Sequence, residues 1–355
     1  MPPQQAERLL DLIYNRLNFR PHSIESISYL SKARTIATGG GRGKGPKARL
    51  SSFRKTQYDS TLVKREYVMS PQQSKILKPK FLNLLIAVFA FTFLNAGARA
   101  HAGEMVQVPS PNGTMVTEVD RPSGKGPFPV VIFSHGRAGD PLDRARMTKP
   151  VSAELVSFWV RRGYAVVAPI RPGYGPTGGS DVEDHGSCDR GPNFGQTASA
   201  AATAIVATVN WVHGQSWAQA DRIILQGQSV GGLGTVAAAA QTPPGVIAYI
   251  NFAGGTGGEP KKSPGVSCRP DLMKSLYGQF GASARMPGIW FYASNDEYWG
   301  PQAPKDWGAA FNGSGGHAKL VFTGPVPNGF GHSLLRTAPQ LWQGELSAFL
   351  KANRL

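Results

Sequence analysis

Short apolar runs separated by turn residues recur along the chain from about residue 101 onward. Six such runs predict strands: Pro129–Phe133, Tyr164–Pro169, Ile223–Gln226, Val246–Asn251, Gly288–Tyr292 and Lys319–Phe322. Runs that are apolar throughout are typical of strands that are buried on both faces of a sheet. Before them, Met105–Val108 and Met115–Val119 flank the turn residues Pro111-Asn112-Gly113, which predicts a hairpin.

Amphipathic stretches lie between these runs and predict helices. The segments Val151–Arg162 and Gln196–Val212 follow predicted strands, and the chain ends with Trp342, Leu346 and Phe349 at helical spacing. An alternation of strands and helices favours a parallel sheet with right-handed crossovers. The pattern therefore predicts an α/β fold with a mainly parallel central sheet and helices on both faces.

A different pattern precedes this body. The uncharged apolar run Phe81–Leu94 follows Lys75, Lys78 and Lys80, and small residues follow it, with A-x-A patterns at residues 98–100 and 100–102. A basic segment, an apolar segment and small residues are together typical of a secretory signal peptide. The run is shorter than the roughly 20 residues that span a bilayer. We predict a signal peptide over residues 69–102 and a periplasmic or secreted protein, with a membrane anchor at residues 81–98 as the alternative.

The net charge of +16 is concentrated in the same N-terminal region. Residues 1–100 hold 17 basic against 5 acidic residues, whereas residues 101–355 hold 21 against 17. Met69 stands just before the predicted leader, so we expect residues 1–68 to be an upstream extension or a disordered segment. The alternative is a basic arm for nucleic acid or membrane. The folded domain is expected over residues 103–355.

The run Ile223–Gln226 leads into a glycine-rich turn that contains a candidate nucleophile. Residues 227–231 read GQSVG, and an alanine-rich stretch at Val236–Ala240 predicts the helix that follows. A G-x-S-x-G pattern between a strand and a helix holds its serine on a tight turn, and the flanking glycines avoid clashes there. We predict that Ser229 is a catalytic nucleophile.

A nucleophilic serine needs a base, and the base needs an acid that orients it. His332 stands between the last predicted strand and the last helix, at the carboxyl end of the sheet. Asp296 follows the predicted strand that begins at Gly288, and the adjacent Glu297 is the weaker alternative. The predicted triad is therefore Ser229, Asp296 and His332.

The loop after Pro129–Phe133 reads SHGRAG and is expected to help bind an oxyanion. We predict that the backbone N–H groups of Arg137 and Val230 form the oxyanion hole, because both are expected beside the serine. The Arg137 side chain either faces solvent or recognises an acidic group. His135 is expected to brace the loop.

Together these motifs resemble those of the dienelactone-hydrolase-like serine esterases of the α/β-hydrolase superfamily, over roughly residues 105–353. The matching pieces are SHGRAG, RPGYG at residues 171–175, GQSVGG, SND and GFGH. The resemblance implies the α/β-hydrolase fold and the nucleophile–acid–base order found here. Dienelactone hydrolases proper use a cysteine nucleophile, so Ser229 favours general ester hydrolysis instead.

The implied reaction is acyl transfer through an acyl-enzyme, with a small-molecule ester as substrate and without a metal or organic cofactor. Nucleic acid is not expected as a partner of the body, and the membrane is expected only transiently, through the signal segment. Asp181, Glu183, Asp184 and His185 are metal-ligating residue types, but their glycine-rich surroundings predict a solvated turn.

Two long loops, Arg171–Asn193 and Gly254–Asp271, are expected to overhang the site. Each holds one of the two cysteines, Cys188 and Cys268, which we predict to form a disulfide in an exported protein; the alternative is two free thiols. The aromatic residues that we expect to line the substrate pocket are Tyr174, Tyr298, Trp299 and Phe330, although each could equally pack in the core.

Two other functions remain open at this level. A prolyl-oligopeptidase-like peptidase uses the same triad, but no propeller domain precedes the body. A non-catalytic binding protein with this fold is the second alternative, and the complete triad argues against it.

Overall fold

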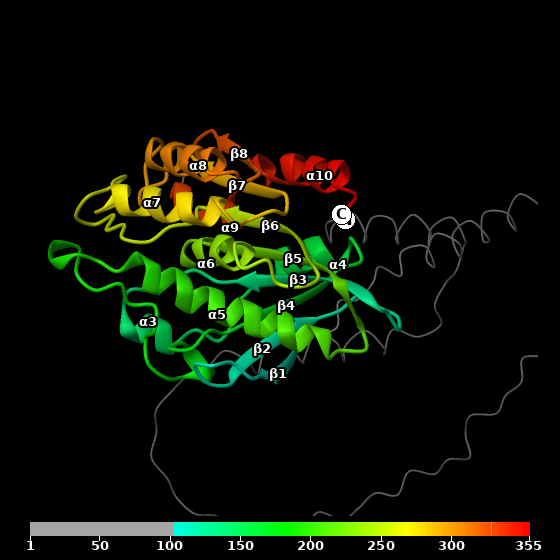
Figure 1. Ribbon diagram of the computed structural model, residues 1–355. Helices are drawn as coiled ribbons and strands as arrows, with labels where there is room; N and C mark the ends of the chain where they lie inside the picture. The colour runs from blue at the N-terminus through cyan, green and yellow to red at the C-terminus, as the bar shows by residue number, and fades with distance from the viewer. Residues whose placement is uncertain (1–102, 328) are drawn as a thin grey trace, which may run out of the picture. The chain divides into compact units, whose positions relative to one another are not determined.

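The computed structural model describes residues 103–327 and 329–355 (Figure 1). In this part of the chain, eight strands form one sheet in the order β1-β2-β4-β3-β5-β6-β7-β8. The strands are β1 (Glu104–Val108), β2 (Met115–Asp120), β3 (Phe128–Ser134), β4 (Ala165–Pro169), β5 (Ala218–Gln228), β6 (Val246–Phe252), β7 (Gly288–Ala293) and β8 (Ala318–Thr323).

The helices of the described residues lie between these strands or at the end of the chain. They are α3 (Pro141–Ala145), α4 (Ala153–Val160), α5 (Phe194–His213), α6 (Val230–Ala239), α7 (Pro270–Gly281), α8 (Ala303–Gly313), α9 (Leu334–Thr337) and α10 (Gln343–Ala352). All eight predicted strands are present, as are helices at the four predicted places.

The sheet is parallel from β4 through β3 to β8, and β1 and β2 join it as an antiparallel hairpin. This confirms the predicted mainly parallel sheet. Strands β4 and β7 are buried at every position, as their uninterrupted apolar sequences predict. The carboxyl ends of the parallel strands meet at one edge, and the loops that follow them carry the candidate site.

Helices cover both faces of the sheet. Helices α5, α6, α7 and α8 pack on one face, where Ile205, Leu233, Tyr277 and Trp307 join a single apolar cluster. Helices α4, α9 and α10 pack on the other face, through residues that include Trp159. Figure 1 shows α5 and α6 side by side in front of the sheet. The sheet is thus buried between two apolar clusters, one on each face.

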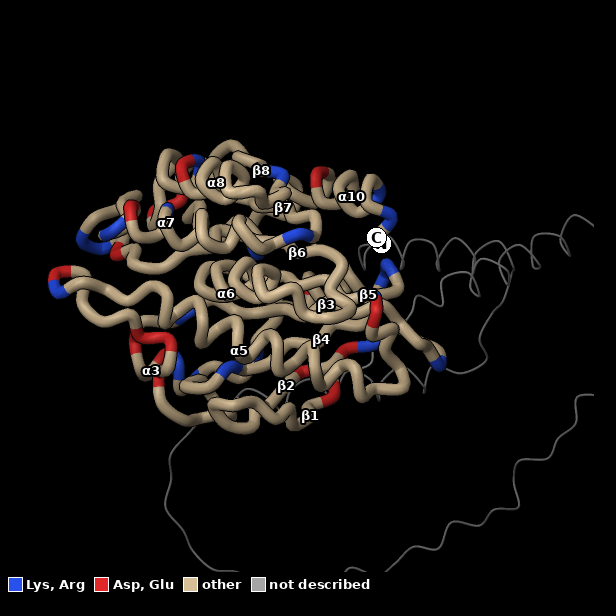
Figure 2. Tube along the Cα trace, viewed as in Figure 1, with Lys and Arg blue, Asp and Glu red and all other residues tan. Residues whose placement is uncertain are grey.

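The predictions for residues 1–68, for the signal peptide at 69–102 and for an anchor at 81–98 lie outside the described residues. Across residues 103–327 and 329–355, no helix is long and apolar enough to cross a membrane. Along the same residues, Lys and Arg positions are interspersed with Asp and Glu positions (Figure 2).

Candidate active site

Ser229 stands on a sharp turn between β5 and α6. Its backbone angles are φ 58° and ψ −126°, a conformation that residues other than glycine seldom adopt. The glycines on either side allow the turn, because a Cβ on Gly227 would lie 2.1 Å from the carbonyl oxygen of Gly231. A Cβ on Gly231 would in turn lie 2.1 Å from the carbonyl oxygen of Ser134. The G-x-S-x-G spacing is thus a steric requirement of this turn.

Two backbone N–H groups flank the serine. Val230 is the first residue of α6, and among the described residues its N–H donates no hydrogen bond; the same holds for the N–H of Arg137. The loop after β3 comes close to the nucleophile, since a Cβ on Gly136 would lie 3.3 Å from the Cβ of Ser229. Two unpaired donors beside one hydroxyl form the arrangement that binds an oxyanion.

His332 and Asp296 meet at the loops after β8 and β7. The imidazole Nδ1 lies 3.1 Å from Asp296 Oδ2 and 3.2 Å from Oδ1. The Asp296 side chain is completely buried, and its Oδ1 also accepts the backbone N–H groups of Tyr298 and Trp299, at 2.9 and 3.3 Å. A carboxylate can only accept, so Nδ1 of His332 is the donor in this contact. Glu297 instead accepts the backbone N–H of His332, at 3.3 Å.

Aromatic rings and a glutamine fix the position of His332. The ring of Tyr298 lies against the imidazole, with centroids 4.1 Å apart, and Trp299 meets it edge-on at 5.5 Å. The side-chain Nε2 of Gln228 donates to the carbonyl oxygen of His332 at 3.0 Å. Sequence reasoning missed Gln228, although it directly precedes Ser229.

Two cavities meet at Ser229. The first, of about 490 Å³, is lined by both Ser229 and His332, and we call it the histidine-side cavity. The second, of about 360 Å³, is lined by Ser229, Val230 and Trp299 but not by His332, and we call it the loop-side cavity because residues 255–262 form its wall. Within the described residues no hydrogen bond joins the Ser229 hydroxyl to His332. Such bonds are often long before substrate binds.

A buried ion pair holds the loop after β3. The guanidinium of Arg171 pairs bidentately with the carboxylate of Glu183, and both side chains are almost completely buried. A third nitrogen of Arg171 donates to Ser134 Oγ at 2.9 Å and to the carbonyl oxygen of His135. The hydroxyl of Tyr174 donates to Glu183 at 3.1 Å. The ion pair thereby anchors the segment that carries the Arg137 N–H.

His135 braces this loop in its neutral form. Its Nδ1 lies 2.7 Å from the carbonyl oxygen of Gly136, and its Nε2 lies 3.1 Å from the backbone N–H of Arg171. One nitrogen therefore donates and the other accepts, which only a neutral imidazole can do. Burial, and then the charge of Arg171, lower the pKa of His135 well below its usual range.

We predicted that residues 181–185 form a solvated turn, and this prediction was wrong for Glu183 and Asp181. Glu183 is the buried partner of Arg171. Asp181 accepts from the Arg137 guanidinium at 2.5 Å and lies 3.2 Å from that of Arg144. Of the two alternatives for the Arg137 side chain, the structure has the second: the side chain recognises an acidic group, and that group is Asp181 of the same chain. These acids pair with arginines because the loop folds back against the loop after β3.

The predicted pocket aromatics lie in three different places. Trp299 lines the loop-side cavity. Tyr174 has no exposed surface and lines neither cavity, because its ring packs on His135 and its hydroxyl binds Glu183. Phe330 is 69% exposed, and it also lines neither cavity. Tyr298, which was also expected in the pocket, lines both cavities.

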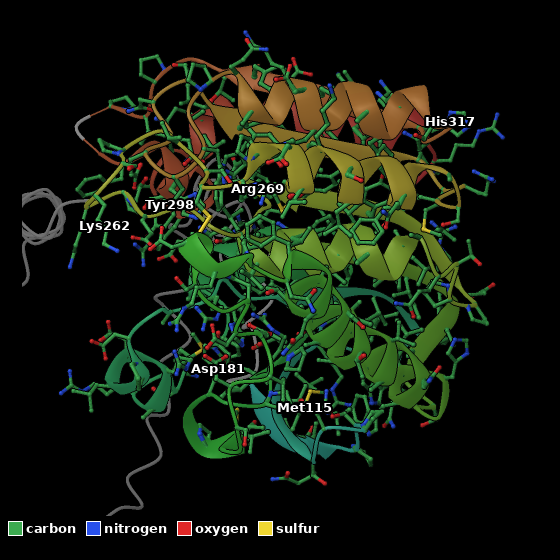
Figure 3. The ribbon with its side chains drawn as sticks, turned by 60° about the vertical axis from the view of Figure 1, so that its left-hand side comes forward. Met115, Asp181, Lys262, Arg269, Tyr298 and His317 are labelled. Atoms are coloured by element: carbon green, nitrogen blue, oxygen red, sulfur yellow. A yellow bond between two sulfur atoms is a disulfide. The ribbon has the colours of Figure 1, made fainter. Side chains whose placement is uncertain are left out.

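A disulfide joins the two long loops at the predicted cysteines, Cys188 and Cys268. The bond lies beside the wall of the loop-side cavity, since the backbone N–H of Cys268 donates to the carbonyl oxygen of Gly257 at 2.9 Å. Figure 3 shows Tyr298, Lys262 and Asp181 at one end of the sheet and His317 at the other. The candidate site thus draws on loops that are far apart in the sequence.

Comparison with known proteins gives a match to one family model and many similar structures. Residues 113–283 match the model of the X-Pro dipeptidyl-peptidase (S15) family; this range includes Ser229 but ends before Asp296 and His332. No curated protein matches the sequence. An esterase of Pyrococcus furiosus is similar at 12% identity and a TM-score of 0.50, covering 71% of this chain and 91% of the esterase.

An acylaminoacyl peptidase of Pyrococcus horikoshii is similar at 13% identity and a TM-score of 0.50. The similarity covers 74% of this chain but 42% of the peptidase. The chain has the α/β-hydrolase fold. In α/β-hydrolases a nucleophile on the turn after the central strand is followed in the chain by an acid and then by a histidine. Ser229, Asp296 and His332 stand in that order along this chain, after β5, β7 and β8.

Proposed function

We propose that this protein is an exported serine hydrolase that cleaves carboxylic esters through an acyl-enzyme. The observation that carries the proposal is the contact of His332 Nδ1 with the buried Asp296, in a site where His332 and Ser229 line one cavity. The esterase and peptidase among the structural neighbours support a serine hydrolase, and the esterase is matched over most of its length.

The reaction begins when His332 Nε2 takes the hydroxyl proton of Ser229 as its oxygen attacks the ester carbonyl. The buried carboxylate of Asp296 stabilises the imidazolium that forms. The negative oxygen of the tetrahedral intermediate accepts hydrogen bonds from the N–H groups of Arg137 and Val230. Each such donor typically contributes on the order of 10²–10³ in turnover.

Collapse of the intermediate breaks the bond to the alcohol, which leaves with the proton held by His332. A water molecule then attacks the acyl-enzyme, and His332 takes its proton and returns it to Ser229. The acid and the free enzyme result. Glu297 is unsuited to the orienting role because its carboxylate binds the backbone of His332 rather than the ring.

We assign the two halves of the ester to the two cavities. The alcohol must leave beside His332, which protonates it, and His332 lines only the histidine-side cavity. The alcohol therefore occupies that cavity, and the acyl group occupies the loop-side cavity. Met147 lines only the histidine-side cavity, so Met147→Trp is expected to lower kcat/KM for esters of bulky alcohols and to spare the preference for acyl length. An altered acyl preference in this variant would reverse the assignment.

The nucleophile is tested by covalent labelling. A fluorophosphonate that mimics the tetrahedral intermediate should modify one residue of the native protein, Ser229, as read by peptide mass spectrometry. Ser199→Ala, which removes an exposed serine on α5, is the matched control and should label normally. Labelling that persists in Ser229→Ala would contradict the proposal.

Peptide hydrolysis is the second candidate function, because the S15 family model matches residues 113–283. Ester and amide substrates share the acyl-enzyme, so the fold does not separate them. Parallel assays with X-Pro p-nitroanilides and with p-nitrophenyl esters distinguish the two. We expect the esters to give the larger kcat/KM.

Export is supported by the disulfide, since structural disulfides persist mainly in oxidising compartments. The test is the location of the protein after expression of the complete chain. We expect ester hydrolysis in the periplasm or the medium, and activity confined to the cytoplasm would contradict export.

A further inference from the structure

Gly103, the first described residue, packs against two buried carboxylates. A Cβ placed on Gly103 would lie 2.7 Å from Glu118 Cγ and 3.0 Å from Asp120 Oδ2. Glu118 and Asp120 are two residues apart on β2, so their side chains lie on one face, where they are 5% and 4% exposed. Both acids therefore occupy the space beside residue 103 that a side chain would fill.

One cation reaches this pair from the described residues. Lys149 Nζ lies 3.0 Å from Glu118 Oε1, although the lysine side chain is 69% exposed. Glu118 Oε2 and Asp120 Oδ2 are buried and have no hydrogen-bond partner in the described part of the chain. Burial, and then the neighbouring Glu118, raise the pKa of Asp120 to about 6. The pair thus holds more negative charge than its surroundings compensate.

The other groups around the pair do not supply that compensation. Glu104 on β1 pairs with Arg121 at 3.0 Å, and both side chains are substantially exposed. Strand β4, which flanks β2, places the apolar residues Val166 and Ala168 opposite Asp120 and Glu118. On the side of residue 103 the nearest carboxylate oxygens are Glu118 Oε1 and the free Asp120 Oδ2, so a cation at that residue faces both acids.

The sequence provides such a cation at that place. Residues 100–102 read AHA, an A-x-A pattern whose cleavage point is the peptide bond before Gly103. A leader peptidase adds water across this bond and leaves a carboxylate on Ala102 and an amine on Gly103. An α-amino group has a pKa of about 8, so it is cationic at neutral pH.

We propose that Gly103 is the N-terminal residue of the mature protein and that Glu118 and Asp120 bind its α-ammonium group. Cleavage of the leader then creates an ion pair that fastens β1 to β2 at the edge of the sheet. The proposal rests on the export included in the proposed function and is independent of the triad.

The first test is the intact mass of the protein after export of the complete chain. The mass expected is that of residues 103–355 with the disulfide formed. A chain that begins at His101, or one that retains residues 1–102, overturns the proposal. Ester hydrolysis by such a protein would still support the function, so the two failures are distinguishable.

The second test is the reactivity of the amine toward an acylating reagent near neutral pH. An opposite charge within about 4–6 Å shifts a pKa by 1–3 units, so the bound amine should react at least about tenfold more slowly in the native than in the unfolded protein. Glu118→Gln with Asp120→Asn should restore fast labelling, and Asp120→Asn alone should do so in part. Glu104→Gln, an exposed carboxylate on the neighbouring strand, is the matched control and should not. Equal rates in native and unfolded protein overturn the binding.

Discussion

At the scale of single residues, Ser229 combines a strained backbone with a reactive hydroxyl. The surroundings impose this conformation, because neither Gly227 nor Gly231 has room for a side chain. Such strain is characteristic of functional sites and is compensated elsewhere in the structure. Here the compensation includes the extended apolar contacts of β5 and α6, which lie in the middle of the core.

The triad residues could be predicted from the sequence because each belongs to a local motif. The partners of those residues could not. Arg171 and Glu183 are 12 residues apart within a loop, and no local pattern indicates that an irregular segment will fold back and bury both. The same folding explains why Asp181 is an ion-pair partner rather than a solvated residue.

Substitution of Arg171 tests the buried ion pair. Arg171→Met leaves the carboxylate of Glu183 buried without its partner, which typically costs about 3–5 kcal/mol of the free energy of unfolding. Urea unfolding measures this loss. The double variant Arg171→Met, Glu183→Leu removes both charges and should recover much of the stability. Equal stability of the single and double variants would contradict the ion-pair account.

His135 gives the protein a specific sensitivity to acid. Its folded-state pKa lies well below the value of 6.5 expected in the unfolded chain, so the unfolded state binds the proton first. The stability contributed by the neutral ring is present above pH 6.5 and is lost as the pH falls toward the folded pKa. We expect the free energy of unfolding to fall less between pH 7 and pH 5 in His135→Gln than in the native protein.

Asp120 changes the pH dependence of the free energy of unfolding in the opposite direction. Because Asp120 is present in both the native protein and His135→Gln, the difference between their pH slopes reports on His135. The pKa of Asp120 is raised to about 6, so its contribution favours folding at low pH and is lost as the pH rises through 6. Identical pH slopes for the native protein and His135→Gln would contradict a neutral His135.

At the scale of elements, the strands were predictable and several helices were not. The parallel strands β3, β4, β6 and β7 are apolar at nearly every position, and β5 is apolar over Ile223–Leu225. This pattern can be recognised without knowledge of the neighbouring elements. Helices α7 and α8 begin with proline in their first turn and contain glycine, which obscures the helical pattern, although Leu272, Leu276 and Phe280 of α7 do stand at helical spacing. Their helical state depends on packing against each other and against β7 and β8.

The disulfide is the element-scale feature that most directly shapes the site. It joins residues 80 apart, and a crosslink of that span stabilises by about 4.5 kcal/mol at most in the chain-entropy model. The variant with Cys188→Ser and Cys268→Ser should therefore unfold at lower urea concentration. Because the bond borders the wall of the loop-side cavity, KM should rise more than kcat falls. An unchanged KM would show that the wall holds its shape without the bond.

At the scale of the whole molecule, the high net charge is separate from the catalytic body. Residues 1–68 hold 13 basic and 5 acidic residues, whereas the body is nearly balanced. We expect that residues 1–68 are not needed for export or activity. A chain that starts at Met69 should therefore be exported with unchanged specific activity. Quantitative assay of the exported fraction against the complete chain checks this. A loss of exported activity would assign the basic segment a role of its own.

The central claim is that Ser229 attacks the ester and that His332 and Asp296 activate it. The most direct measurement is hydrolysis of p-nitrophenyl esters of graded acyl length by the native protein and by Ser229→Ala. We predict an initial burst of one p-nitrophenol per active site for the native protein. For the variant we predict no burst and a loss of kcat of at least about 10³-fold. Retention of full activity in Ser229→Ala would contradict the account.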